Sequence, residues 1–162
     1  MKRWWIGFLM ALLLGGCAAE ETFETVSDEI VQPVLAQSRQ IILALPEEAA
    51  APAAESDGGA LYQCEGYEIM VQTLEGGDLD RTLRELTGYA GEELTVLETQ
   101  GDGGKRYELV WASAGENGPR IGRAMIVDDG SYHYCVSTLA DADRAEEFRE
   151  SWRILFGSIS LS

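Results

Sequence analysis

Residues 106–139 read RYELVWASAGENGPRIGRAMIVDDGSYHYCVSTL, and this stretch decides the fold. Two turn signals, Asn117-Gly118 and Asp129-Gly130, divide it into three runs rich in β-branched and aromatic residues. These dipeptides tolerate the positive φ angles that tight hairpin turns require. In the last run Tyr132, Tyr134 and Val136 recur at every second position, as on one face of a strand. The stretch therefore predicts consecutive hairpins in an antiparallel meander.

The same strand pattern continues on both sides of this stretch. Within it, we expect strands at 106–113, 121–127 and 132–139. Outside it, short apolar or alternating runs bounded by turn residues predict strands at 39–45, 61–64, 67–74, 94–99 and 158–161.

Two segments instead have the spacing of amphipathic helices. The first follows Asp78, a predicted N-cap, and carries Leu79, Leu83 and Leu86 on one face before Gly88. The second covers residues 143–156 and has an apolar stripe of its own. The fold class we predict is therefore α+β, with an antiparallel sheet of six or seven strands and two amphipathic helices packed on one face.

The N-terminus has the organisation of an export signal. Met1-Lys2-Arg3 precedes an apolar run over residues 4–14, and Gly15-Gly16-Cys17 follows. The run is shorter than the roughly 20 residues of a membrane-spanning helix. Its LLGGC ending resembles the lipobox of bacterial lipoproteins. That resemblance implies that Cys17 receives a diacylglyceryl group, that the peptide before it is removed, and that acyl chains such as palmitate anchor the protein at the outer side of the cell membrane. The alternative is an ordinary secretory signal that leaves a soluble protein.

These features predict a simple domain organisation. Residues 1–16 are the signal peptide, 17–37 a tether and N-terminal segment, and 38–162 a single α+β domain. Within the domain, residues 46–59 read PEEAAAPAAESDGG, which lacks periodicity and predicts a mobile loop.

Net charge restricts the possible partners. The chain has a formal charge of −16, and removal of Lys2 and Arg3 with the signal leaves −18. Such a surface repels nucleic-acid phosphates and anionic lipid headgroups. We therefore expect no nucleic-acid partner, and membrane attachment through the lipid on Cys17 alone.

Cysteine usage suggests a covalent link within the domain. With Cys17 acylated, Cys64 and Cys135 remain as a pair in an exported protein, and we predict a disulfide between them. The alternative is two buried free thiols. The sequence has no Cys-x-x-Cys motif and only one histidine, so it predicts no metal site and no cofactor.

Ser131 and His133 are the candidates for catalysis, and they define an alternative function as an envelope hydrolase. They share a predicted strand face near Asp128, but side chains at i and i+2 are about 7 Å apart, too far for a direct hydrogen bond. A Gly-x-Ser-x-Gly elbow is also missing from the sequence. We therefore expect no catalytic residues.

The most exposed-looking polar and aromatic residues of the meander form a candidate ligand or partner surface. It consists of Asp128, Asp129, Tyr132, His133 and Tyr134. Asp at a hairpin tip also serves turn geometry by itself, which is the simpler interpretation of Asp128 and Asp129.

A meander followed by an amphipathic helix ending in WRILF at 152–156 and by a short strand from Ser158 resembles the PsbP-like fold. Proteins of that shape serve mainly as binding or assembly factors, and this analogy transfers no catalytic residue. We therefore expect a non-catalytic binding or assembly module of the cell envelope that binds an envelope protein or a small ligand. An acidic structural spacer is the remaining alternative.

Overall fold

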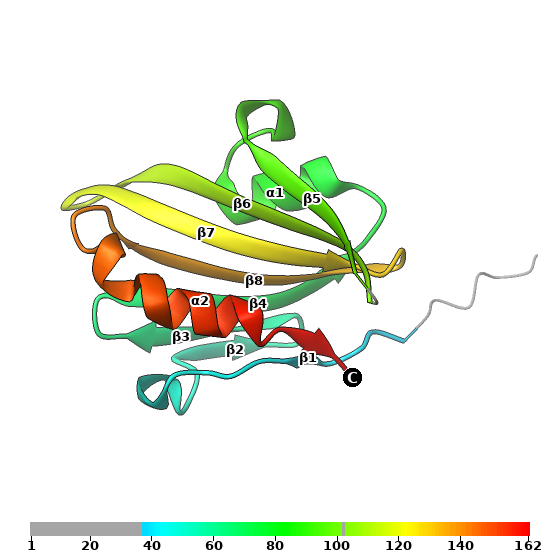
Figure 1. Ribbon diagram of the computed structural model, residues 1–162, viewed down its shortest axis with the longest axis horizontal. Helices are drawn as coiled ribbons and strands as arrows, with labels where there is room; N and C mark the ends of the chain where they lie inside the picture. The colour runs from blue at the N-terminus through cyan, green and yellow to red at the C-terminus, as the bar shows by residue number, and fades with distance from the viewer. Residues whose placement is uncertain (1–36, 102) are drawn as a thin grey trace, which may run out of the picture. The chain divides into compact units, whose positions relative to one another are not determined.

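The computed structural model describes residues 37–101 and 103–162, which belong to one compact unit (Figure 1). Cys17 and the rest of the predicted signal and tether up to residue 36 lie outside the described residues. The strands are β1 (Ile41–Ile42), β2 (Ala54–Ser56), β3 (Gly59–Cys64), β4 (Tyr67–Glu75), β5 (Val96–Gly101), β6 (Gly104–Gly115), β7 (Gly118–Asp128), β8 (Tyr132–Asp141) and β9 (Ser160–Leu161). The helices are α1 (Leu79–Thr87) and α2 (Arg149–Gly157), with 3-10 turns η1 (Glu47–Ala49), η2 (Gly91–Glu93) and η3 (Ala145–Phe148).

Seven of the strands form one antiparallel sheet in the order β2-β3-β4-β8-β7-β6-β5. Strands β5 to β8 are the predicted meander, and Gly118 and Gly130 adopt φ angles of 141° and 92° at its turns. Strand β8 then pairs with β4, with Cys135 opposite Gln72, so the meander joins the β2–β3–β4 hairpins in one sheet. The predicted α+β fold with an antiparallel meander is confirmed.

Both faces of the sheet are covered, one by each helix (Figure 1). The α2 face carries Tyr134 and Val136, which pack with Trp152 of α2. The α1 face carries Cys135, which alternates with them along β8 and packs with Leu83 of α1. The prediction that both helices lie on one face is therefore wrong. The central strands are apolar at consecutive positions, so each face needs its own cover.

Helix α1 has the ends that its sequence predicts. The Asp78 carboxylate accepts a hydrogen bond from the backbone N–H of Arg81 at 3.0 Å, and Gly88 has the left-handed φ of 81°. The segment predicted as one helix over 143–156 is instead divided into η3 and α2, because the helix becomes regular only from Arg149.

The first and the last described strands meet on the α2 face. Only Ile41 and Ile42 of the predicted strand 39–45 form β1, which pairs with β9 through Ile41 opposite Leu161. The stretch 46–59, predicted as a loop, contains η1 and the edge strand β2. Ala49 of η1 is buried in the core, which anchors this stretch despite its composition.

The predicted disulfide between Cys64 and Cys135 is wrong, since both are free thiols. Cys64 packs with the cluster on the α2 face, whereas Cys135 lies in the cluster on the α1 face. Cys64 lies opposite Tyr67 of β4, and Tyr67 lies opposite Ala140 of β8. Ala140 is five residues from Cys135 along β8. That offset is about 17 Å at the rise of a strand, far beyond the roughly 7 Å Cα separation that a disulfide tolerates. Burial raises the pKa of the Cys135 thiol to about 12, where it is unreactive.

Candidate functional site

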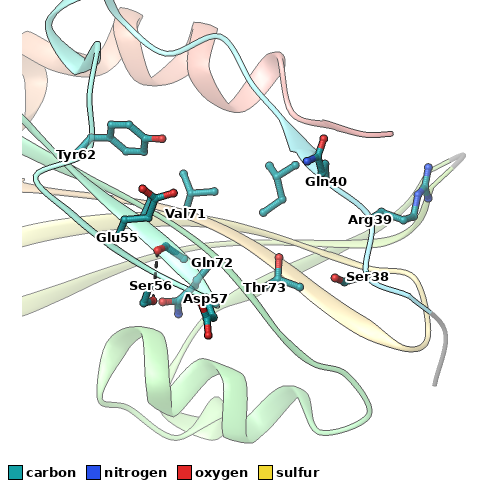
Figure 2. Close-up of a pocket in the computed structure, with 14 residues that line it drawn as sticks. Ser38, Arg39, Gln40, Glu55, Ser56, Asp57, Tyr62, Val71, Gln72 and Thr73 are labelled. Carbon is teal, nitrogen blue, oxygen red and sulfur yellow. Dashed lines mark hydrogen bonds between the residues drawn. The ribbon is translucent and has the colours of Figure 1, made fainter.

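A groove opens between the extended residues 38–41 and the β2 edge of the sheet (Figure 2). Its volume is about 510 Å³, within the roughly 300–1,000 Å³ typical of small-molecule sites. Residues 55–60 form the wall opposite 38–41, and β3 and β4 contribute the floor. We call this cavity the β2 groove.

The floor of the β2 groove is apolar. Tyr62 of β3 and Val71 of β4 line it, and Ile41 borders it from the wall formed by residues 38–41; all three are partly buried against the core on the α2 face. Because each packs on the core, the floor is fixed before any ligand arrives. An apolar floor of this kind favours burial of the ring or hydrocarbon part of a small molecule.

The rim of the groove is polar. Its amides, hydroxyls and carboxylates supply both hydrogen-bond donors and acceptors. They come from Ser38, Gln40, Glu55, Asp57 and Thr73, whereas the side chains of Ser56 and Gln72 turn to the α1 face. Figure 2 shows Glu55 beside Tyr62 and Val71, over the floor. The arrangement suits a ligand with an apolar body and several polar groups.

The charges of the groove favour neutral and cationic ligands. Arg39 lines it, but its guanidinium donates to the backbone oxygens of Leu161 at 3.0 Å and Ser162 at 3.5 Å. The other charged groups of the lining are the carboxylates of Glu55 and Asp57, and neither forms an ion pair within the described part of the chain. The lining is therefore unfavourable for anions.

A chain of hydrogen bonds holds the N-terminal wall of the groove. The backbone N–H of Arg39 donates to the Tyr134 hydroxyl at 2.9 Å, and this hydroxyl donates to the Asp129 carboxylate at 2.8 Å. Burial acts to raise the pKa of Asp129, but bonds from the backbone N–H groups of Ser131 and Tyr132 and from Tyr134 outweigh it and lower the pKa. Tyr134 and Asp129, predicted as surface residues, thus fix the segment that lines the groove.

His133 is a core residue, with only 1% of its surface exposed. Its Nδ1 lies 2.7 Å from the Thr82 hydroxyl of α1, and its Nε2 lies 3.7 Å from the Asp128 carboxylate. Ser131 is exposed at the β7–β8 turn, and no hydrogen bond joins it to His133 in the described structure. The two residues of the hydrolase hypothesis are thus not brought together, and the imidazole joins α1 to β8.

The predicted surface over 128–134 divides into buried and accessible parts. His133 and Tyr134 are buried, so the prediction that they form an accessible surface is wrong. Asp128, Asp129 and Tyr132 are partly exposed. The two carboxylates satisfy the turn: Asp128 accepts from the backbone N–H of Gly130 at 2.7 Å, and Asp129 from those of Ser131 and Tyr132, each at 2.9 Å.

A second cavity of about 400 Å³ lies at the same sheet edge. Leu61, Met70 and Leu74 line it and belong to the α1 face, and the polar side chains that reach it are few. It offers apolar contact without the convergent polar groups that fix a ligand's orientation. The β2 groove is therefore the better candidate site.

Sequence reasoning missed the β2 groove because its walls come from segments far apart in the chain. Residues 38–41 reach it only through pairing with the C-terminal strand, and residues 55–57 lie in a stretch of loop-like composition. The one local signal is the SDGG turn at 56–59, which reverses the chain between β2 and β3.

Metal binding and membrane crossing have no support in the described residues. Over 37–101 and 103–162, no group of three or more His, Cys, Asp or Glu side chains is arranged to hold a metal ion. Over the same ranges, no helix combines the length and the apolar character needed to cross a membrane.

Known proteins resemble this chain in fold. No protein-family model and no curated protein sequence matches it. The crystal structure of LpqN, involved in cell envelope biogenesis of Mycobacterium tuberculosis, aligns with a TM-score of 0.53 and 16% identity over 77% of this chain and 84% of LpqN. A Bacteroides thetaiotaomicron structure aligns with a TM-score of 0.47 and 10% identity over 75% of this chain and 45% of its own. The likeness to LpqN shows a shared fold.

Proposed function

We propose that this protein is a lipoprotein anchored at the extracytoplasmic face of the membrane, whose domain binds a small neutral or cationic ligand in the β2 groove as a non-catalytic module of the cell envelope. The observation that carries the binding role is the groove itself, with its fixed apolar floor of Tyr62 and Val71 beneath a polar rim. The role of LpqN in envelope biogenesis, on the same fold, supports the envelope context.

The anchor determines where the groove works. A diacylglyceryl group on Cys17 brings two acyl chains, which give stable attachment where one chain gives only marginal binding. Residues 18–37 span at most roughly 70 Å when fully extended. The domain then acts close to the membrane, held by a short acidic tether and kept from the anionic lipid surface by its own charge.

A binding role fits the chemistry of the groove better than hydrolysis. Glu55 and the amide of Gln40 hold and orient a polar ligand, whereas the one histidine is committed to Thr82 in the core on the other face. A nucleophile needs a base within hydrogen-bond reach, and among the described residues no hydrogen bond joins a hydroxyl of the groove lining to Glu55 or Asp57.

The anchor is tested by Cys17→Ala in the source organism fed with an alkyne-labelled fatty acid. We expect the variant to lose the label and to be absent from the mature, membrane-bound fraction. Cys64→Ser, which removes a cysteine of the folded domain, is the control and should keep both label and membrane retention. A Cys17→Ala protein that is still labelled would refute the lipid anchor.

The groove is tested by native mass spectrometry of the full-length lipoprotein with the polar small-molecule fraction of its own envelope. We expect a bound neutral or cationic compound with wild type. Thr73→Arg, which adds bulk and a positive charge at the rim, should abolish it, while Thr95→Arg outside the groove should not. Equal binding by both variants would place the ligand elsewhere.

A further inference from the structure

Strand β5 is an open edge of the sheet. It spans the six residues Val96–Gly101 and ends the strand order, with β6 as its one neighbour among the described strands (Figure 1). One row of its backbone N–H and C=O groups therefore faces outward and can pair with another strand. The opposite edge, β2, is only three residues long and is flanked by the groove.

The α2 face next to this edge exposes apolar side chains. Leu97 of β5 and Val110 of β6 are 59% and 58% exposed. Leu97 pairs with Glu108, two residues from Val110 on the same face, so the two apolar side chains are diagonal neighbours. The core cluster under α2 draws its buried sheet residues from β4, β7 and β8 and includes none from β5 or β6. This part of the face is thus left without cover in the described structure.

The edge carries neither of two residues, proline and lysine, that commonly keep edges from pairing. Its sequence, VLETQG, has no proline and no lysine, and it holds a regular register with β6 along its whole length. A long open edge beside exposed apolar residues is a template for β-strand addition.

Charge selects the occupant. Between residues 92 and 101 the chain carries Glu92, Glu93 and Glu98 and no lysine or arginine. Pairing β5 with the same strand of a second copy would bring these acids together, between molecules that are each strongly acidic. Glu98 is paired with Lys105 at 3.0 Å, but both side chains are about half exposed, and such a pair is readily exchanged for a partner's cation.

We propose that β5 binds an extended segment of a partner protein that adds an antiparallel or parallel strand, places apolar residues over Leu97 and Val110, and carries lysine or arginine toward the Glu98 side. The inference is independent of the β2 groove, which lies at the other edge of the sheet. It gives the module two separate functions, with ligand binding at β2 and protein binding at β5.

Two synthetic peptides, (Lys-Val)₄ and (Glu-Val)₄, test the edge in amide hydrogen exchange of the full-length lipoprotein. We expect (Lys-Val)₄ to slow exchange over Val96–Gly101, less so at high salt, and (Glu-Val)₄ to have no effect. Leu97→Lys should weaken this binding about tenfold through lost apolar contact and added repulsion. Ile154→Lys is the matched control, at an apolar residue of α2 that is 52% exposed. It should leave the binding of the peptide unchanged. Equal protection by both peptides, or protection at β2 alone, would overturn the proposal.

The native partner is tested by a photo-crosslinking residue in place of Thr99 in whole cells. We expect an adduct whose linked segment, identified by mass spectrometry, is an extended stretch containing lysine or arginine. The adduct should disappear with Leu97→Lys. An adduct of twice the chain's own mass would show that a second copy binds the edge. An adduct yield no higher than with the crosslinker at Ile154 would show that the edge binds no partner. Either result would overturn the proposal.

Discussion

The Asp129 carboxylate accepts three hydrogen bonds, from the backbone N–H groups of Ser131 and Tyr132 and from the Tyr134 hydroxyl. Its pKa is lowered in the folded protein relative to an unfolded value of about 3.9. The ionised group therefore stabilises the fold at pH values above the unfolded pKa. This contribution is lost as the pH falls through the folded-state pKa.

We predict that Asp129→Asn lowers the free energy of unfolding by about 1–2 kcal/mol at pH 7, because hydrogen bonds to a charged acceptor are replaced by neutral ones. The difference between wild type and variant should shrink as the pH falls below about 4. Urea denaturation at a series of pH values measures it. A difference that stays constant from pH 7 to pH 3 would show that the charge is not responsible.

Thr82 and His133 are both fully buried, and their side chains form a hydrogen bond with each other. We predict that Thr82→Val costs about 1–3 kcal/mol, because a buried imidazole nitrogen is left without a partner. Thr95→Val, at an exposed position, is the control and should change stability by less than about 0.5 kcal/mol. If the imidazole has only this structural role, groove binding by Thr82→Val should remain at the wild-type level under conditions where the variant is folded.

At the scale of single residues, the sequence identified the turn and cap residues well and the residues that line the groove poorly. Asp78, Gly88 and Gly130 act locally, and their roles follow from backbone conformation alone. The aromatic and charged residues near Tyr132 were predicted to form a surface because their side chains carry polar groups. Their hydrogen-bond partners, Thr82 and the Arg39 amide, lie 51 and 95 residues away in the chain. No local pattern indicates these partners.

The elements carry their own signals where they are local. Helix α1 was predicted within a residue because cap, stripe and terminal glycine agree. The placement of helices on both faces was missed, although the consecutive apolar residues Ala124–Val127 in β7 are typical of a strand buried on two sides.

The capping interaction at α1 is testable at the scale of the element. We predict that Asp78→Ala lowers the free energy of unfolding by about 1 kcal/mol, because the N–H of Arg81 loses its acceptor, and that Asp78→Asn retains most of that stability. Thermal denaturation followed by circular dichroism distinguishes the two variants. Equal losses for both would mean that charge at the helix N-terminus, rather than the hydrogen bond, provides the stabilisation.

At the scale of the whole molecule, the fold is closed by contacts between the first described segment and the C-terminal strand. Residues 39–45 pack on the α2 face and pair with the last residues of the chain, an interaction with a separation of about 120 residues. No local pattern encodes such a pairing. The same closure builds the N-terminal wall of the β2 groove, which explains why the fold class was predictable and the groove was not.

The Tyr134 hydroxyl joins this closure to the sheet, so it links the stability of the fold to the N-terminal wall of the β2 groove. We predict that Tyr134→Phe, which keeps the ring in the core, lowers the free energy of unfolding by about 1–2 kcal/mol through two lost hydrogen bonds. Exchange of the Arg39 amide should accelerate, and ligand affinity should fall, because the wall of the groove loses its link to Asp129. Tyr132→Phe, on the same strand face with its ring 6.2 Å away, is the control. It should leave the exchange of the Arg39 amide and the ligand affinity unchanged. If Tyr134→Phe loses stability but keeps full affinity, the wall formed by residues 38–41 is not needed for binding and the ligand rests on the floor and the β2 wall alone.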